Sequence, residues 1–495
     1  MEEARQTESA WEVRLGVPEP ELDKLSLASA RPRRLRAWLD ALPIGDPHRG
    51  APPLLTLLEE LPRLRIDGRR RLALLEEIRP RLRQLAYTLE SRYLNLPLMP
   101  PERALQAAAL SHRLFQGLAI GYQSVAAPLL RGKLNRPERQ AAATALQRAM
   151  DARAQDLFLH MLLYKEPPAG TWQVLHNLYA EAERHALEAL TVSDPELPGE
   201  EGAVLIAYGR LLLTASAQPN QLRQPALMAL YRAAAHWARW MPLLADATDA
   251  PFHVDLQSDA GPQPLSAPAE DGGPALRYFD TRPLAAALAQ GGPGHRGRPL
   301  SDILSHHLRW AWLGPRERRG PRRPADGEML LCLGLDAVHR RLDQGEAEGD
   351  EPLHRVRRVD HGDGGYCLEW RGGTPTILRA GGLLALSPME QSQWRVGEIR
   401  WVAWLGDAVR LGVALLPETL RPVRVSAGGP SAWPAPALLV PAPEGDDPET
   451  LVVPTTGYRS GTRLILWDGP PRDTRLGVRL AGSPDIAQYT LRPAV

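Results

Sequence analysis

The sequence is poor in cysteine, with Cys332 and Cys367 as the two cysteines among 495 residues. Both lie in runs that are typical of strands, where a buried free thiol is the usual state. We therefore expect no disulfide and no metal bound through these side chains. So little cysteine in so long a chain also fits a reducing compartment.

Long apolar stretches are absent as well. No window reaches the roughly 18 uninterrupted apolar residues that a membrane helix needs. The N-terminal MEEARQTESAWEVRLG is acidic and polar, whereas a signal peptide is basic and then apolar. We therefore expect no membrane insertion and a cytoplasmic location. Lysine is also scarce, and the excess of arginine together with Ala, Pro and Gly is typical of GC-rich bacterial genomes.

Enzyme signatures are missing too. The chain has no G-x-S-x-G, no Walker loop and no H-E-x-x-H. The GPGHRG at 292–297 satisfies G-x-G-x-x-G, but it follows a helix-like segment where a dinucleotide fold needs a strand. His176 and His185 are nine residues apart and so face opposite sides of a helix, and His306 and His307 have no carboxylate at ligand spacing. We expect no catalytic residue, no metal site and no cofactor.

The first half of the chain, residues 33–245, has helical periodicity. In the segment 67–94, Asp67 is a suitable N-cap, and apolar residues recur every three or four positions with arginines on the other face. Four further runs of this kind follow, separated by Pro, Gly, Asp and Asn. We expect an antiparallel helical array over residues 1–250. The apolar positions of the first segment are Leu72, Leu75, Ile78, Leu82, Leu85 and Leu89.

One of these helical runs is compatible with a repeat. Trp172, Leu175 and Tyr179 match the start of the tetratricopeptide pattern W-x-x-L-G-x-x-Y, but His176 replaces its glycine and no 34-residue period is evident. The alternative is that the three side chains share one stripe facing the core.

The composition changes twice after the helical half. Residues 251–300 are rich in Pro, Gly, Asp and Ser around one short helical run, which indicates a connector or a small insert. After a further helix, short apolar runs begin with MLLCLGLDAVH at 329–339 and are separated by turn residues. Their spacing predicts an antiparallel barrel or sandwich over residues 301–425, and the same pattern continues in a second β subdomain over 426–495.

Arginines cluster directly before the first of these predicted strands. The segment RERRGPRR contains Arg316, Arg318, Arg319, Arg322 and Arg323. Such a cluster alone is usually a solvated linker or a weak nucleic-acid patch. Nucleic acid is disfavoured here by the net charge of +1 and by the lack of interleaved aromatic residues.

The order of motifs after this cluster resembles a PilZ domain over residues 314–420. An R-x-x-x-R spacing occurs twice, at Arg319 to Arg323 and at Arg318 to Arg322. Asp360 then opens a D-x-G-x-G-G version of the family's D-x-S-x-G-G motif, in which Gly362 stands in place of serine. The strand runs LRAGGLLALS, WRVGEIRWVAW and AVRLGVALL follow in the family's order.

The resemblance implies a six-stranded antiparallel barrel that binds cyclic di-GMP. By this resemblance Arg318, Arg319, Arg322 and Arg323 form an arm that grips phosphates and stacks on guanine, which a guanidinium does better than an ammonium group. Asp360 accepts a hydrogen bond from a guanine edge. Gly362 and Gly365 let the backbone approach the ligand and turn with positive φ.

The resulting expectation is a non-catalytic cyclic di-GMP effector whose helical domain contacts a protein partner. The alternative is a scaffold or adaptor with a degenerate barrel that binds no nucleotide, which the missing serine at Gly362 favours. A second basic stretch precedes Asp360, in which Arg355 and Arg357 share one face of a strand and Arg358 points to the other. These arginines either supplement the ligand site or are solvated charges at a strand edge.

Overall fold

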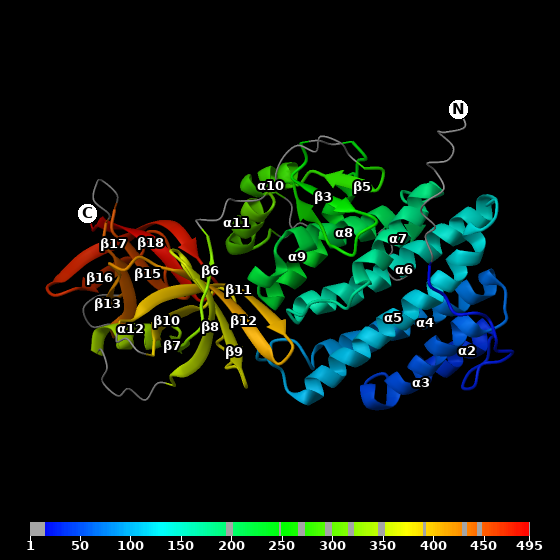
Figure 1. Ribbon diagram of the computed structural model, residues 1–495, viewed down its shortest axis with the longest axis horizontal. Coiled ribbons are helices and arrows are strands. Elements are labelled where there is room, and N and C mark those ends of the chain that lie inside the picture. The colour runs from blue at the N-terminus through cyan, green and yellow to red at the C-terminus, as the bar shows by residue number, and fades with distance from the viewer. Residues whose placement is uncertain are drawn as a thin grey trace.

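The computed structural model describes residues 15–194, 201–246, 249–265, 273–292, 299–314, 321–344, 352–389, 393–427, 433–442 and 448–494. Helices fill one end of an elongated molecule and two β-barrels fill the other (Figure 1). The multidomain α plus β architecture expected from the sequence is confirmed. Within the described residues, no helix is long and apolar enough to cross a membrane.

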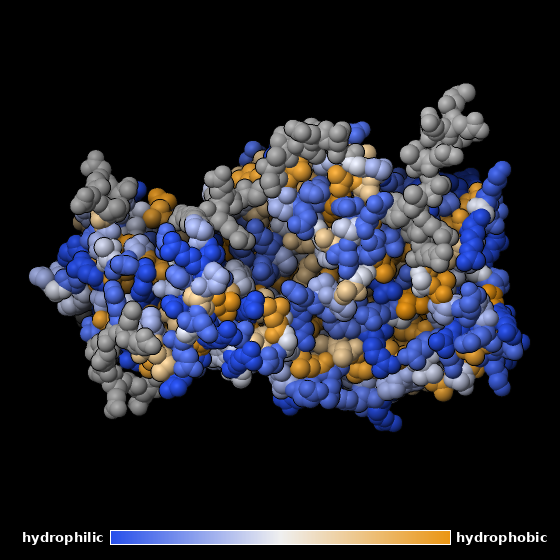
Figure 2. Space-filling model, viewed as in Figure 1, coloured by the Kyte–Doolittle hydropathy of each residue, from blue (hydrophilic) through white to orange (hydrophobic). Residues whose placement is uncertain are grey.

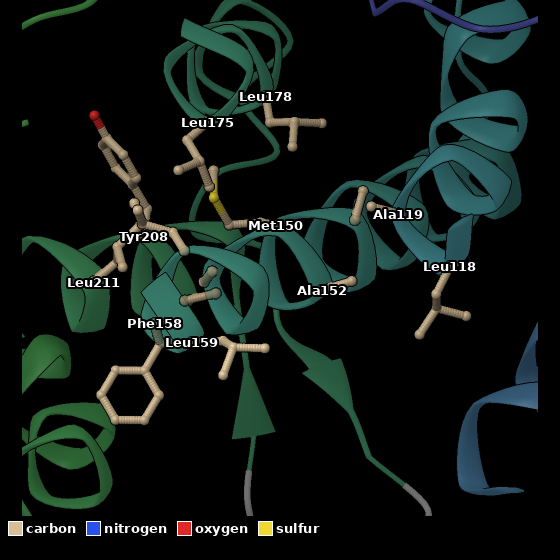
Figure 3. Close-up of a cluster of buried hydrophobic side chains, with 14 of the residues drawn as sticks. Leu118, Ala119, Met150, Ala152, Phe158, Leu159, Leu175, Leu178, Tyr208 and Leu211 are labelled. Atoms are coloured by element: carbon tan, nitrogen blue, oxygen red, sulfur yellow. The ribbon is translucent and has the colours of Figure 1, made fainter. Parts of the chain in front are cut away.

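The helical array is built around three long helices, α4, α5 and α6, with α5 packed against both of its neighbours (Figure 1). Side chains of α6 such as Met150 and Leu159 lie among residues of α5, α7 and α8 in one continuous core (Figure 3). The helices are α2 (Pro32–Asp40), α3 (Pro47–Glu60), α4 (Gly68–Glu90), α5 (Glu102–Leu130), α6 (Arg136–Leu162), α7 (Thr171–Arg184), α8 (Val204–Ser216) and α9 (Gln224–Trp237).

Helix α4 follows its sequence pattern closely. The Asp67 carboxylate accepts a hydrogen bond from the backbone N–H of Arg70 at 2.9 Å, so the expected N-cap is present. The apolar positions from Leu75 to Leu89 are buried. Two arginines depart from the expected exposed face: Arg71 is buried against three backbone carbonyl oxygens, and Arg79 is buried in an ion pair with Asp194.

The tetratricopeptide-like stripe lies on α7. Leu175 and Tyr179 are buried in the core of the array, as the core-facing interpretation requires. Trp172 covers Gly261, where a Cβ atom would come within 2.7 Å of the indole. The helices range from 9 to 29 residues, so their lengths do not follow one repeated unit.

The Pro- and Gly-rich region folds onto the helical array. Strands β3 (Phe252–Asp255), β4 (Gln263–Pro264) and β5 (Leu276–Phe279) form a small sheet that precedes α10 (Arg282–Ala289) and α11 (Asp302–Ala311). Buried side chains of this region belong to the helical core, including Leu304 and Leu308 of α11, the helix expected to accompany the barrel. Of the GPGHRG motif, only Gly292 lies within the described residues.

The first barrel is closed by six antiparallel strands in the order β8, β7, β10, β11, β12, β9 and back to β8. A short additional strand, β6 (Arg323–Pro324), pairs with the end of β8. Alternating residues of each strand fill the interior, among them Leu331, Leu368 and Leu411. The six strands are β7 (Glu328–Leu333), β8 (His354–Gly362), β9 (Gly365–Arg371), β10 (Leu383–Pro388), β11 (Arg395–Leu405) and β12 (Ala408–Leu415).

The expected strand at 329–339 is wrong in its second half, which is helix α12 (Leu335–Gln344). Gly334, with φ of 88°, ends β7 because it takes a left-handed conformation that favours glycine. Leu335, Val338 and Leu342 then recur with helical spacing and fill the space between the two barrels.

The second barrel, also closed, confirms the additional β subdomain. Its order is β13, β14, β15, β18, β17, β16. The expected boundary at residue 425 falls inside β13, which the apolar pattern did not single out as a strand. The strands are β13 (Arg421–Ser426), β14 (Ala435–Val440), β15 (Thr450–Pro454), β16 (Arg463–Trp467), β17 (Pro471–Gly482) and β18 (Ile486–Pro493).

Both barrels contact the helical array. From the second barrel, Asp485 binds Arg223 through two hydrogen bonds, and Arg379 of the first barrel donates to the same carboxylate. At the tip of β11, the Trp404 N–H donates to the Tyr164 carbonyl at 2.8 Å. The surface is hollowed where the two halves meet (Figure 2), and a cavity of about 1260 Å³ lies at this junction, lined by residues of both halves.

Candidate ligand-binding site on the first barrel

The candidate site begins with the arm at residues 321–324, the described part of the arginine cluster. Arg323 pairs with His361 and Pro324 with Asp360 in the β6–β8 ladder. This pairing brings the Arg322 Nη1 to 2.8 Å from the Asp360 Oδ1, in an ion pair that is partly open to solvent. Arg318 and Arg319 lie outside the described residues.

A β-bulge turns Asp360 toward the outer face of the barrel. Arg358 pairs with Leu368, and Asp360 pairs with Cys367, so Val359 is an extra residue in β8. Leu368 faces the barrel interior and Cys367 does not. Because the extra residue shifts the alternation by one, Asp360 emerges beside the arm instead of pointing inward.

The hairpin between β8 and β9 is tight and joins Gly362 to Gly365 as a cross-strand pair. None of its residues has a φ in the left-handed region, so the expected turn with positive φ is wrong. Glycine is required at position 365 for a different structural reason. A Cβ atom at this position would lie 2.0 Å from the carbonyl oxygen of Val413 on β12, so only glycine allows the two strands to approach.

Gly362, which occupies the family's serine position, faces the arm. A Cβ atom here would lie 3.2 Å from the Pro321 carbonyl oxygen and 3.6 Å from the Arg322 Cδ. The arm backbone therefore packs on the bare glycine, and a side chain would have to move it by a few tenths of an ångström.

An aromatic side chain extends the same outer face. Asp360 pairs with Cys367 on β9, Cys367 with Gly412 on β12, and Gly412 with Trp401 on β11. A Cβ atom at Gly412 would lie within 2 Å of the Trp401 Nε1, so the indole lies over Gly412 and leans from β11 toward β9. Burial, and then the negative charge of Asp360, raise the pKa of the Cys367 thiol.

On the same outer face, arginines of three neighbouring strands surround one buried carboxylate. Glu369 of β9 lies between Arg357 of β8 and Arg410 of β12. Its carboxylate oxygens are 3.0 Å from Arg371, 3.8 Å from Arg410 and 3.9 Å from Arg357. The sequence reasoning missed Trp401, Arg371 and Arg410. The alternation of β12, which places Arg410 opposite the buried Val409 and Leu411, was the signal that could have found Arg410.

The second basic stretch has the expected alternation. Arg355 and Arg357 are exposed on either side of buried Val356. Arg357 donates to the Asp326 carboxylate at 3.0 Å, and Arg358 donates to the Asp326 backbone carbonyl at 3.3 Å. These contacts hold the loop before β7 against β8.

The histidine pairs considered from the sequence have packing contacts. His176 is buried between the Tyr208 hydroxyl and the Ala260 carbonyl, whereas His185 lies beyond the end of α7, 3.6 Å from Glu181. His307 contacts the Ala217 carbonyl at 2.8 Å, and His306 accepts from the Trp310 indole. The two residues of each pair contact different groups.

Two family models match the chain, in the same order as its domains. The model of the middle PilZ domain of the cyclic-di-GMP receptor FimW matches residues 340–422. The chain contains a PilZ domain. This match covers β8 to β12 with the β8–β9 hairpin, and it begins after the arginines of the arm. The model of the FimW N-terminal domain matches residues 33–247, which span the helical array.

A curated relative extends the similarity beyond the PilZ domain. The chain is 25% identical to the cyclic-di-GMP receptor FimW of Pseudomonas aeruginosa, over 97% of this chain and 93% of the relative. The similarity therefore includes the helical array and the second barrel as well as the PilZ domain.

Proposed function

We propose that this protein is a non-catalytic receptor for cyclic di-GMP in the bacterial cytoplasm, with its ligand site on the outer face of the PilZ barrel. The observation that carries the proposal is the pairing of β6 with β8, which joins the arm to the hairpin motif through the Arg322–Asp360 contact. The similarity to a relative described as a cyclic-di-GMP receptor supports the same ligand.

The chemistry of the ligand fits the groups on this face. Cyclic di-GMP has two phosphates and two guanines. Arg322 and Arg323 offer planar guanidinium groups that can bind a phosphate in a bidentate manner or pair with the O6 and N7 atoms of guanine. Asp360 is an acceptor for guanine N–H groups. On binding, the ligand replaces the partly exposed Arg322–Asp360 ion pair with charge-assisted contacts to both partners.

Trp401 and Arg410 extend the proposed site beyond the family motifs. The indole over Gly412 is a flat apolar surface on which a guanine can stack, and such stacking contributes about 1–3 kcal/mol per base. Arg410 lies two residue pairs away on β12, at the next position on the same face, and supplies a positive charge. Arg318 and Arg319 complete the arm by the resemblance to the family.

The output of the receptor is proposed to pass through the helical array to a protein partner. Ligand contacts with the arm alter its position on β8, and the array is joined to both barrels by Arg223, Tyr164 and their partners. In this way, ligand binding to the PilZ barrel changes the position of the helical array relative to the barrels, and the protein partner responds to that change.

Calorimetric titration of the full chain with cyclic di-GMP tests the proposal. We expect binding that an Arg322→Ala/Arg323→Ala variant weakens about 100-fold, because it loses two charge-assisted contacts. The matched control is Arg472→Ala/Arg475→Ala on β17 of the second barrel, which should bind like the wild type. Absence of binding at tens of micromolar ligand, or equal affinity of the arm variant, would overturn the proposal.

A further inference from the structure

Two helices of the array bring polar side chains together inside the apolar core. His112 and Gln116 are one turn apart on α5, and Asp156 and His160 are one turn apart on α6. Residues four apart lie on the same face of a helix, so the two pairs face each other where α5 packs on α6. One ligand atom each of His112, Asp156 and His160 lies within 4.8 Å of the others.

The cluster is buried and incompletely hydrogen-bonded. Asp156 is 3% exposed and His160 is 9% exposed. The Asp156 carboxylate contacts the His112 Nδ1 at 2.6 Å and accepts from the Gln116 amide at 3.0 Å. The His160 Nδ1 is buried and has no hydrogen-bond partner among the described residues, although the two imidazole rings are only 4.2 Å apart. Buried polar atoms without a partner are rare, and a bound ion or water often satisfies them.

We propose that His112, Asp156 and His160 bind a divalent transition-metal ion of the zinc class. Two imidazole nitrogens and one carboxylate oxygen are a preferred set for tetrahedral Zn²⁺, with ligand distances of about 2.0–2.2 Å. The fourth position falls to water or to the Gln116 amide oxygen after a flip of that amide. The proposal replaces the expectation from the sequence that the chain holds no metal.

Small side-chain rotations suffice to form this site. The three ligand atoms already lie within 4.8 Å, and a tetrahedral ion needs them about 3.4 Å apart. His112 keeps 16% of its side chain exposed, which gives the ion an entry route. If the His112 Nδ1 carries the proton of its contact with Asp156, that proton leaves when the nitrogen becomes a ligand, because metal ligands must be deprotonated.

The cations closest in sequence to Asp156 and His160 are engaged elsewhere. Arg153 donates to the Gln123 amide oxygen at 3.1 Å, and the Lys165 ammonium lies 3.7 Å from the centre of the Trp404 ring. The positive charges of Arg153 and Lys165 disfavour a metal ion nearby, but the negative Asp156 carboxylate, as a ligand, is closer to the ion. Neither of these two residues therefore has to move for the ion to bind.

Titration of the metal-free full chain with Zn²⁺ by calorimetry, and with Co²⁺ by visible absorption, tests the proposal. We expect one equivalent to bind, with affinity at least tenfold lower in Asp156→Asn and in His160→Ala. Asn has nearly the same shape as Asp, so Asp156→Asn should fold and keeps the test possible even if His160→Ala does not fold. His236→Ala, an exposed histidine on α9, is the matched control and should bind like the wild type.

A second readout separates a built site from weak surface binding. Zn²⁺ should raise the melting temperature of the wild type and of His236→Ala, but not that of Asp156→Asn, because an ion that binds only the folded state stabilises it. Binding by the wild type that is no tighter than binding by both cluster variants would overturn the proposal. These readouts use no nucleotide, so they are independent of the proposed receptor function.

Discussion

The two barrels of this chain share one architecture and differ in what is added to it. Each closes six antiparallel strands around an apolar interior. Arginines decorate both outer faces, and β17 of the second barrel has bulges of its own. The first barrel alone has a further strand, β6, in the described part of the chain, and this strand sets an arginine beside an aspartate. Neither surface charge nor a bulge therefore makes the candidate site by itself, because the site arises where the added arm meets a bulge and a hairpin.

The largest effect in this comparison is expected from Gly365→Ala. The new methyl group would meet the Val413 carbonyl oxygen at 2.0 Å, so β9 and β12 must separate and the PilZ barrel loses several kcal/mol of stability. Gly364→Ala is the adjacent control, because a Cβ atom there has open space. Thermal unfolding should show an early transition for the first variant alone. Equal melting of the two variants would contradict the close strand approach.

Asp360→Ala removes the carboxylate of the Asp–Arg ion pair on the first barrel, and the second barrel has a comparable ion pair that serves as a control. We expect cyclic di-GMP affinity to fall about 10- to 100-fold, since the guanine edge and Arg322 both lose a charged partner. Asp468→Ala removes the partner of Arg421 and Arg472 on the second barrel and should leave affinity unchanged. Calorimetry measures both. A similar loss in the two variants would indicate a general charge effect instead of a site at β8.

Trp401→Ala tests the stacking surface. The loss of one base-stacking contact should weaken cyclic di-GMP binding by about tenfold, or about 1.4 kcal/mol. Trp433→Ala is the matched control, because this exposed tryptophan precedes β14 of the second barrel. Competition of the two variants for labelled ligand would resolve the difference. Wild-type affinity in Trp401→Ala would confine the site to the arm and the hairpin.

Gly362→Ser addresses the alternative that the barrel is a scaffold that binds no nucleotide. We expect the affinity to change by less than about threefold, because the gained hydroxyl hydrogen bond is offset by displacement of the Pro321 carbonyl at 3.2 Å. Calorimetry on the variant and the wild type decides this. If binding appeared only after serine was introduced, the native chain would be a scaffold.

The smallest effect concerns pH and the contact of the second barrel with the helices. Burial raises the pKa of Asp485, but the hydrogen bonds and charges of Arg223 and Arg379 outweigh it and hold the pKa below its ordinary value. The carboxylate therefore stabilises the fold above about pH 4, and this contribution is lost as the pH falls through the folded-state pKa. Asp485→Asn should lower the melting temperature by a few degrees at pH 7 and by less at pH 3. An equal decrease at both pH values would rule out the ionised pair as the cause.

Local patterns in the sequence predicted much of the fold. Alternation identified most barrel strands, and Asp67 with its periodic leucines identified α4. The run at 329–339 was misjudged because a short apolar run suits a strand or a helix equally, and only the space between the barrels selects the helix. Asp360 and the arm came from motif order, whereas Trp401 over Gly412 depends on strand register, which no local pattern carries.

The metal-binding cluster illustrates the same limit. Asp156 and His160 are four residues apart on one predicted helix, a spacing that the sequence does display. His112 lies 44 residues before Asp156, and only the packing of α5 on α6 joins it to the pair. The spacing of histidines along the chain therefore carries no signal for this combination.

Strand β11 joins the outer face of the PilZ barrel to the helical array through a short piece of backbone and non-covalent contacts at Trp404. Trp401 lies at the outer face of the barrel, and Trp404, three residues later, donates its backbone N–H to Tyr164 and lies under the Lys165 ammonium just past the end of α6. At about 3.3 Å per residue, only about 10 Å of stiff backbone separates the two tryptophans. We therefore expect a displacement at the Trp401 end of β11 to reach the segment that follows α6 along this short stretch of strand.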